Sequence, residues 1–146
     1  MIDGFELIGR ALQQIPGTKS LVYFGYALGR DSSGPGRAVG KSYENAMEAL
    51  SAARTSVFAL DITDADYHTL GTGLMLLSED TGGFYVKTHE LPDIAMDRLR
   101  RTISSYYELS IISPPDLGDR FKVKVKVERP RVRVHTRQWH PSAYEW

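Results

Sequence analysis

The sequence contains no cysteine and no long apolar run. The missing cysteine excludes a disulfide framework and any thiolate metal or redox site, but it leaves the compartment open because some exported proteins also lack cysteine. No apolar run approaches the roughly 18 residues that a membrane-spanning helix requires. Residues 1–4 do not begin a signal peptide. We therefore expect a soluble chain without a membrane span.

Recognisable catalytic motifs are missing as well. No G-x-S-x-G elbow surrounds a serine, and the four histidines show neither an H-E-x-x-H motif nor an i, i+4 pair. Residues 34–40 contain a G-x-G-x-x-x-G pattern, but its first glycine follows the nearest predicted strand by about nine residues. A phosphate-binding turn runs directly from strand to helix. The sequence therefore favours a protein that is not an enzyme and holds no cofactor.

Length and composition indicate one globular domain over residues 1–146, with 42% apolar and 25% charged residues. The formal net charge is zero, yet the charges are unevenly distributed. Residues 120–140 hold eight of the 18 Lys and Arg residues and a single acid, Glu128. The C-terminal end is thus basic on an otherwise acidic body.

Three apolar runs with helical patterns between them indicate the fold class. Residues 55–62 are rich in β-branched and aromatic side chains without strict alternation, as is typical of a central parallel strand covered on both faces. Residues 21–25 and 83–87 repeat the pattern on either side of it. Strands that alternate with helices indicate βαβ units, so we predict an α/β protein with a parallel sheet between layers of helices.

The helical segments have signals at their ends and along one face. The first is predicted over residues 4–15, Ser42 is predicted to cap the second, and Gly82 and Gly83 are predicted to end the third in a left-handed cap. The fourth is predicted to begin at Leu91-Pro92 and to end near residue 104. The predicted buried faces are Phe5, Ile8, Leu12 and Ile15 in the first helix, Tyr43, Ala46, Met47, Leu50 and Ala53 in the second, and Leu91, Ala95, Leu99 and Ile103 in the fourth.

The last third of the chain changes to short strands. We predict strands over residues 106–112, 121–127 and 131–136, with a turn over residues 113–119. The strict alternation of the last two predicts a largely antiparallel unit with one wet face. The predicted buried face comprises Val123, Val125, Val127, Val132 and Val134. The predicted exposed face comprises Lys122, Lys124, Lys126, Arg131, Arg133 and His135.

Three roles are open for the basic residues of that exposed face. Lysines on an exposed sheet keep it soluble and prevent unwanted strand pairing, which is a purely structural role. The face also suits an acidic protein partner or the phosphates of a nucleic acid. Nucleic acid is disfavoured because its binders usually carry aromatic side chains for base stacking, and this face has none before Trp139.

Five segments carry a family resemblance. Residues 15–24 read IPGTKSLVYF, residues 52–61 read AARTSVFALD, and residues 77–83 read LSEDTGG. Residues 104–109 read SSYYEL, and residues 121–134 read FKVKVKVERPRVRV. In this order the segments resemble motifs of the von Willebrand factor A-related (VWA-related) proteins of the acidobacterial type. The resemblance covers nearly the whole chain.

The resemblance implies the second half of a doubly wound A-domain sheet over residues 1–105 and an antiparallel β extension over residues 106–146. The D-x-S-x-S motif, the main part of the metal-ion-dependent adhesion site of a complete A domain, is absent from the sequence. Residues 25–27 read GYA where metal-binding relatives have S-D-G. The resemblance therefore implies a protein-interaction module without a complete metal site, in a secreted or periplasmic protein.

An alternative function rests on three acids at the end of the central strand. Asp61 ends that strand, and Asp64 and Asp66 follow in a polar segment. Ligands usually bind at the carboxyl edge of an open α/β sheet, and clustered carboxylates suit Mg²⁺ or Ca²⁺. The acids are thus candidate ligands of a metal- or nucleotide-dependent enzyme. The structural interpretation is a solvated loop with capping aspartates.

A half sheet also leaves one strand without a neighbour. In a complete A domain the strand at residues 21–24 lies in mid-sheet, so one side of Leu21 and Tyr23 lacks its pairing partner here. We expect a second copy of the chain to cover this edge in a homodimer, or the C-terminal strands to fold back onto it. Tyr23→Pro is expected to disrupt either pairing because it removes a backbone donor.

Overall fold

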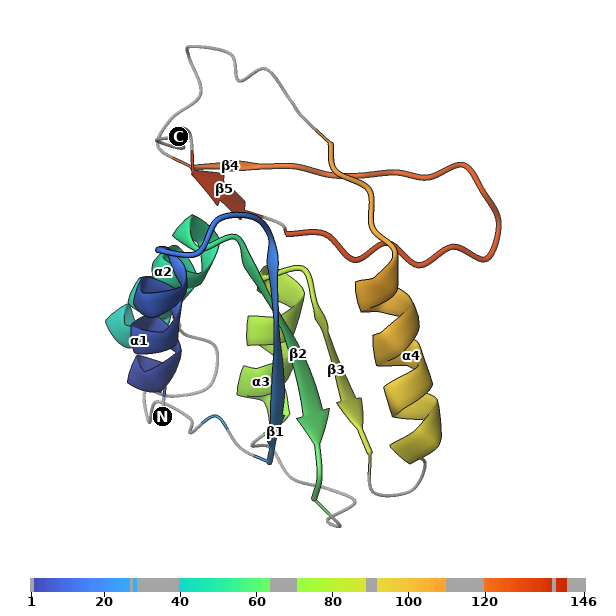
Figure 1. The fold of residues 1–146 in the computed structure, drawn as a ribbon, viewed down its shortest axis with the longest axis horizontal. Coiled ribbons are helices and arrows are strands. Elements are labelled where there is room, and N and C mark those ends of the chain that lie inside the picture. Colours follow the sequence, from blue (N-terminus) through green and yellow to red (C-terminus); the bar gives the residue numbers. More distant parts are fainter. Residues whose placement is uncertain are drawn as a thin grey trace.

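The computed structural model describes residues 2–26, 28, 40–63, 71–88, 92–109, 120–137 and 139–141, with residues 120–122 and 139–141 described by their backbone. Most of these residues form an α/β body, and a C-terminal hairpin follows (Figure 1). The elements in chain order are α1 (Ile2–Leu12), β1 (Lys19–Gly25), α2 (Lys41–Ala52), β2 (Thr55–Asp61), α3 (Gly71–Asp80), β3 (Phe84–Lys87), α4 (Pro92–Ser104), β4 (Arg120–Lys122) and β5 (Trp139–Pro141).

The sheet of the α/β body contains β1, β2 and β3 in that spatial order, and all pairs are parallel. The central strand β2 pairs with β1 from Thr55 to Asp61 and with β3 from Phe58 to Asp61. The predicted class, half of a doubly wound parallel sheet with helices on both faces, is confirmed. In the described part of the chain, the outer edges of β1 and β3 pair with no further strand.

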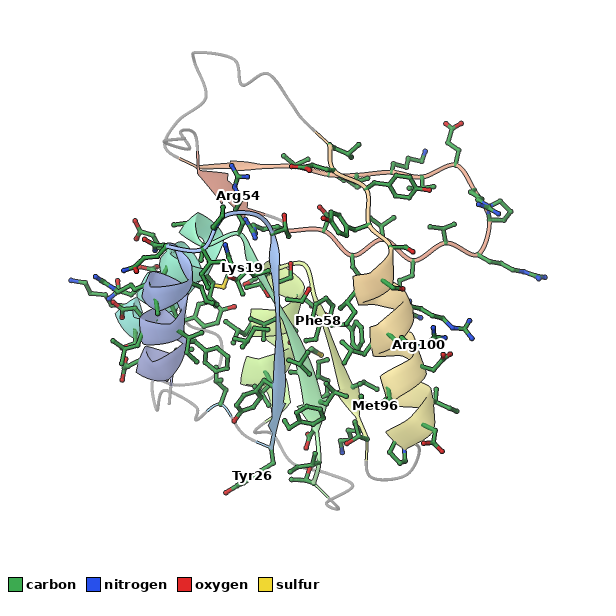
Figure 2. All side chains as sticks on the ribbon, in the orientation of Figure 1. Lys19, Tyr26, Arg54, Phe58, Met96 and Arg100 are labelled. Atoms are coloured by element: carbon green, nitrogen blue, oxygen red, sulfur yellow. The ribbon has the colours of Figure 1, made fainter. Side chains whose placement is uncertain are left out.

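Helices cover both faces of this sheet. Val57 and Ala59 of β2 belong to the core beneath α1, α2 and α3, whereas Phe58 and Leu60 belong to the core beneath α4. All four side chains are buried, and Figure 2 shows Phe58 between the sheet and α4. Because successive side chains of a strand point to opposite faces, a strand buried on both sides must be apolar at every position. This explains the continuous apolar run of residues 57–60.

Helix α1 packs through a glycine that the apolar pattern did not indicate. Its buried residues are Phe5 and Gly9, whereas Ile8 is 41% exposed and Ile15, beyond the helix end, is 51% exposed. The predicted face was therefore wrong at Ile8 and Ile15. A Cβ atom added at Gly9 would lie 2.8 Å from the carbonyl carbon of Ala49 on α2. The absence of a side chain at Gly9 lets the two helix backbones approach, and this contact sets the rotation of α1.

In the next helices most predicted buried positions are confirmed, and α4 spans Pro92–Ser104 as predicted. In α2 Tyr43, Ala46 and Leu50 are buried as predicted, but the helix is capped by Gly40, without a side-chain cap, and not by Ser42. In α4 the structure confirms Ala95 and Leu99, while Ile103 is 42% exposed because it lies beyond the edge of the core. Leu91 lies outside the described residues.

The segment Thr81-Gly82-Gly83 joins α3 to β3 and has a structural role at each position. The Thr81 hydroxyl accepts a hydrogen bond from Val57 N–H at 3.0 Å and donates one to the Leu77 carbonyl at 2.7 Å. Gly82 has a φ of 81°, which confirms the predicted left-handed cap. A Cβ atom at Gly83 would collide with the Val57 carbonyl oxygen. The segment therefore needs a hydroxyl and two glycines to pass beside β2.

The C-terminal hairpin differs from the predicted antiparallel unit. Its ladder joins only β4 and β5, with Arg120 opposite Pro141 and Lys122 opposite Trp139. Residues 123–128 and 132–137 continue as two arms without strand pairing, and the chain reverses at Pro130 and Arg131. The hairpin lies across the end of the sheet where β1, β2 and β3 begin (Figure 1). The second arm packs against the α/β body through His135 and Arg137.

The buried and exposed faces of the hairpin also differ from the predicted ones. Val123 and Val125 are half-buried as expected, but Val127, Val132 and Val134 are exposed. His135, which was predicted to face solvent, is half-buried and contacts Gly83. Arg131 has a φ of 61°, so the turn changes which face of the second arm meets the body.

Two further expectations concern the remainder of the chain. The strand predicted over residues 106–112 does not form at residues 106–109, and residues 110–112 and the turn at residues 113–119 lie outside the described residues. Within the described ranges, no helix is long and apolar enough to cross a bilayer.

Candidate functional site

The carboxylate of Asp61 lies buried at the carboxyl edge of the sheet, as its position at the end of β2 predicts. One oxygen accepts hydrogen bonds from Thr63 N–H at 3.0 Å and from the Thr63 hydroxyl at 2.6 Å. The other accepts a short hydrogen bond from the Tyr85 hydroxyl. The Asp61 carbonyl accepts bonds from the backbone N–H and the hydroxyl of Thr88. Asp61 therefore ties the ends of β2 and β3 together.

This arrangement gives Asp61 a structural role. Both carboxylate oxygens already accept hydrogen bonds from protein groups, and burial together with the bond to Asp61 raises the pKa of Tyr85. Asp64 and Asp66, the other candidate ligands for Mg²⁺ or Ca²⁺, lie outside the described residues. Among the residues that the structure describes, no group of three or more His, Asp or Glu side chains is placed to hold a metal ion.

The basic residues of the hairpin do not form the continuous face that the sequence predicts. Lys124 and Lys126 are exposed on the first arm, Arg131 lies in the turn, and Arg133 lies on the second arm. The side chain of Lys122 is outside the described part. Because the arms are not paired beyond β4 and β5, these charges are spread along two separate segments. Arg133 lines a pocket beside β3.

The outer edge of β1 is the open edge predicted from the half sheet. Leu21 and Tyr23 are half-buried and pack on the core beneath α1 to α3, with the Tyr23 ring 5.4 Å from that of Phe5. On the opposite face Val22 packs on the core beneath α4, whereas Phe24 is 57% exposed. The C-terminal strands pair only with each other in the described part, so their predicted fold-back onto this edge is wrong there.

The hydrogen bonds of β1 show which of its backbone groups face outward. Lys19 N–H donates to the Arg54 carbonyl, and the Gly25 carbonyl accepts from Ile62 N–H. Alternate residues of a parallel strand bond to the same neighbour, so Tyr23 also points its backbone groups at β2. Val22 and Phe24 point theirs away from the sheet. Tyr23→Pro would therefore break the β1–β2 ladder itself, so the prediction that it tests the open edge was wrong.

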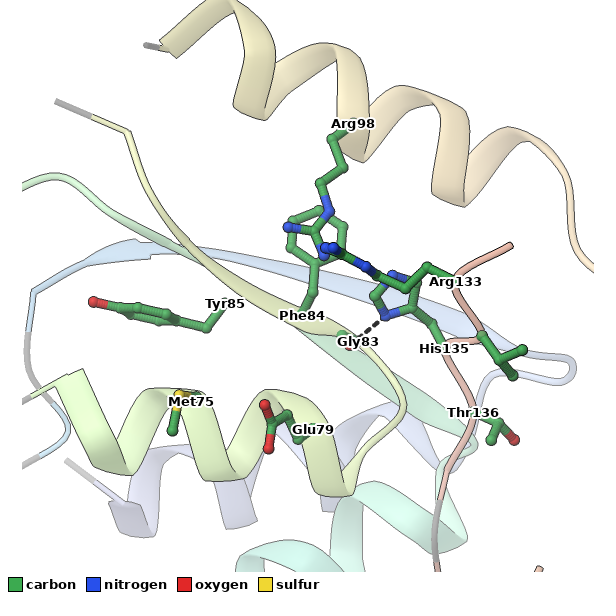
Figure 3. Close-up of a pocket in the computed structure, with 10 residues that line it drawn as sticks. Met75, Glu79, Gly83, Phe84, Tyr85, Arg98, Arg133, His135 and Thr136 are labelled. Carbon is green, nitrogen blue, oxygen red and sulfur yellow. Dashed lines mark hydrogen bonds between the residues drawn. The ribbon is translucent and has the colours of Figure 1, made fainter. Parts of the chain in front are cut away.

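A pocket of about 500 Å³ lies beside β3, at the other outer edge of the sheet (Figure 3). Gly83, Phe84 and Tyr85 line it along the strand. Met75 and Glu79 approach it from α3, Arg98 approaches from α4, and the hairpin arm closes one end. The arm residues that line it are Arg133, Val134, His135 and Thr136.

The α4 side of this pocket is cationic. The Arg98 guanidinium lies 4.0 Å above the Phe84 ring, and in Figure 3 the side chains of Arg98 and Arg133 lie close together. Burial and the charge of Arg133 lower the pKa of Arg98. Within the described residues, neither guanidinium has a carboxylate within 4.0 Å. Half-buried Arg98 and exposed Arg133 thus lie together without a counter-charge from those residues.

His135 completes the wall of the pocket. Its Nδ1 lies 3.1 Å from the Gly83 carbonyl oxygen, and its ring packs on Phe84 with centroids 5.5 Å apart. A carbonyl oxygen can only accept, so Nδ1 carries the proton in this contact. Burial lowers the pKa of His135, the bond to Gly83 opposes that shift, and the charges of Arg98 and Arg133 add to it. The ring is therefore neutral near pH 7.

Sequence reasoning missed this pocket because its residues come from segments far apart in the chain. Arg98 appears in the sequence as one of three arginines within residues 98–101 of the fourth predicted helix, and His135 appears as part of a wet strand face. No protein-family model, curated protein or solved structure matches the chain. The resemblance to VWA-related proteins therefore stays a prediction.

Proposed function

We propose that the chain is a non-enzymatic protein-interaction module and that a second copy of the chain binds along the outer edge of β1. One observation carries the proposal: β1 is apolar on both faces, yet its outer edge pairs with no strand in the described part. Unpaired N–H and C=O groups beside an exposed Phe24 form a template for strand addition. A soluble protein with such an edge is stabilised by a partner that covers it.

A second copy fits this edge by symmetry. A two-fold axis through Tyr23 pairs β1 with β1 of the other copy in antiparallel orientation and places Phe24 of one copy opposite Val22 of the other. Val22 and Phe24 are the residues whose backbone groups face outward, so they form the hydrogen-bonded pairs. Their side chains lie on the α4 face of the sheet, and Phe24 would lose its exposed area there. The two sheets would then continue into one.

The oligomeric state tests the proposal. Light scattering coupled to size-exclusion chromatography at micromolar concentration is expected to give the mass of a dimer. Phe24→Lys is expected to give a monomer with an unchanged fold, because a charge on an exposed strand edge opposes pairing. Leu7→Lys is the matched control, since Leu7 is an apolar residue that is 69% exposed on α1 and is not part of a strand edge. A monomeric wild-type protein, or a Phe24→Lys variant that still dimerises, would contradict the proposal.

A further inference from the structure

The outer edge of β3 offers backbone groups to the pocket. Thr88 N–H donates to the Asp61 carbonyl, so Thr88 points its backbone groups at β2, and the alternation of a parallel ladder gives Phe84 and Val86 the same direction. Tyr85 therefore points its N–H and C=O groups away from β2, along the pocket that it lines. A strand that enters this pocket can form hydrogen bonds with Tyr85 in the manner of strand addition.

The two walls of the pocket differ in charge. Arg98 and Arg133 lie on the α4 side, whereas Met75 and Glu79 lie on the α3 side (Figure 3). Side chains of an added strand alternate between the two faces of the sheet. Every second residue of the added strand would then face the guanidinium pair, and the residues between would face a methionine and a carboxylate.

The chemistry of these walls selects the occupant. Two guanidinium groups without a nearby carboxylate among the described residues match a carboxylate, which arginine binds through two parallel hydrogen bonds. Nucleic acid fits less well, because the Phe84 ring is buried and covered by Arg98. Phe84 therefore offers no free aromatic face for base stacking.

We propose that this pocket binds an acidic, extended peptide segment of a partner protein, which adds as a strand to the outer edge of β3 and places a carboxylate against Arg98 and Arg133. The segment carries acids at alternate positions and apolar or basic residues between them, which contact Met75 and Glu79. The proposal extends the proposed interaction module from the edge of β1 to the opposite edge of the sheet. A monomeric protein that binds such a peptide would refute the β1 dimer and would support the peptide site.

Titration with defined peptides tests the proposal. The probe is a short capped peptide of alternating Glu and Val, and the reference peptide has Gln in place of Glu. Calorimetry with the full chain is expected to show binding of the Glu peptide and, for the Gln peptide, a loss of affinity on the order of tenfold or more. Two further Glu peptides carry N-methyl groups either at every Glu or at every Val, and one of the two is expected not to bind, because its methyl groups block the edge that pairs with β3.

Variants of the chain locate the binding. Arg98→Gln and Arg133→Gln are each expected to lower the affinity for the Glu peptide on the order of tenfold. Arg100→Gln is the matched control, because Arg100 is 72% exposed on the same helix, forms an ion pair with Asp97 and lies away from the pocket (Figure 2). It removes the same charge but is expected to leave binding unchanged. Arg133 is exposed, so its variant tests the site even if Arg98→Gln lowers stability.

A last pair of measurements tests the α3 wall. Replacing Val by Lys in the Glu peptide is expected to strengthen binding, and Glu79→Gln is expected to remove that gain in affinity.

Equal affinity for the Glu and Gln peptides, or an equal loss of affinity with Arg98→Gln and Arg100→Gln, would overturn the proposal. So would competition by inorganic phosphate or a single-stranded oligonucleotide at the same concentration as the peptide, since either would mean a general anion site.

Discussion

The close approach of α1 and α2 gives a sharp test of the structure. Gly9→Ala adds a Cβ atom 2.8 Å from the Ala49 carbonyl carbon and from the Leu50 nitrogen, which are backbone atoms that cannot rotate away. The overpacking costs about 1–3 kcal/mol, partly offset by about 1 kcal/mol of gained helix propensity. We expect Gly9→Ala to lower the free energy of unfolding by up to about 2 kcal/mol, which corresponds to a fall in Tm of about 3 °C for each kcal/mol.

Gly4→Ala is the control on the same helix. A Cβ atom at Gly4 meets no other atom within 4 Å, so only the helix propensity changes, and stability should rise by up to about 1 kcal/mol. Urea unfolding followed by circular dichroism measures both variants, with equal m-values as the sign that only stability has changed. If Gly9→Ala stabilises the protein as much as Gly4→Ala does, the helices are not in contact at Gly9 and the packing argument fails.

Three further predictions concern buried polar groups. Thr81→Val should cost about 1–3 kcal/mol because it leaves Val57 N–H buried without its acceptor, and Thr81→Ser should recover most of that loss in urea unfolding. Ser78→Ala should raise Tm, or leave it unchanged, because the Ser78 hydroxyl is buried without a partner among the described residues. The lowered pKa of His135 means that the unfolded chain binds the proton first, so this contribution to stability is present above about pH 6.5 and is lost below it. His135→Asn should reduce the fall in Tm between pH 7 and pH 5.5, and an unchanged fall would show that His135 is not buried.

The α/β body could be predicted because each of its strands has a local signal. The run at residues 57–60 is apolar at every position only because helices cover both faces, and the structure confirms this. The buried face of α1 could not be predicted in the same way. A pattern of apolar residues favours Ile8, but α1 approaches the α2 backbone at Gly9, which has no side chain to mark it.

The candidate sites likewise combine features that have a local sequence signal with features that depend on distant residues. Asp61 was predicted at the sheet edge because it ends a strand, but its hydrogen bond to Tyr85 depends on the neighbouring strand. The period-two pattern of the hairpin predicts alternation but not which face is buried, and the conformation of Arg131 decides that His135 meets the body. The pocket beside β3 combines four separate segments, so no local pattern indicates it.

The second arm of the hairpin implies an order of folding. Arg137 donates a hydrogen bond to the Ser51 carbonyl, and Thr136 and Arg137 lie against Gly82. The arm therefore contacts a surface that forms only when α2, α3 and β3 have packed together. The arm adds no strand to the sheet of β1, β2 and β3. Contacts between residues so distant in sequence form late because closing the long loop costs entropy. The arm therefore docks after the body has folded, and in native-state hydrogen exchange it would open without unfolding β2.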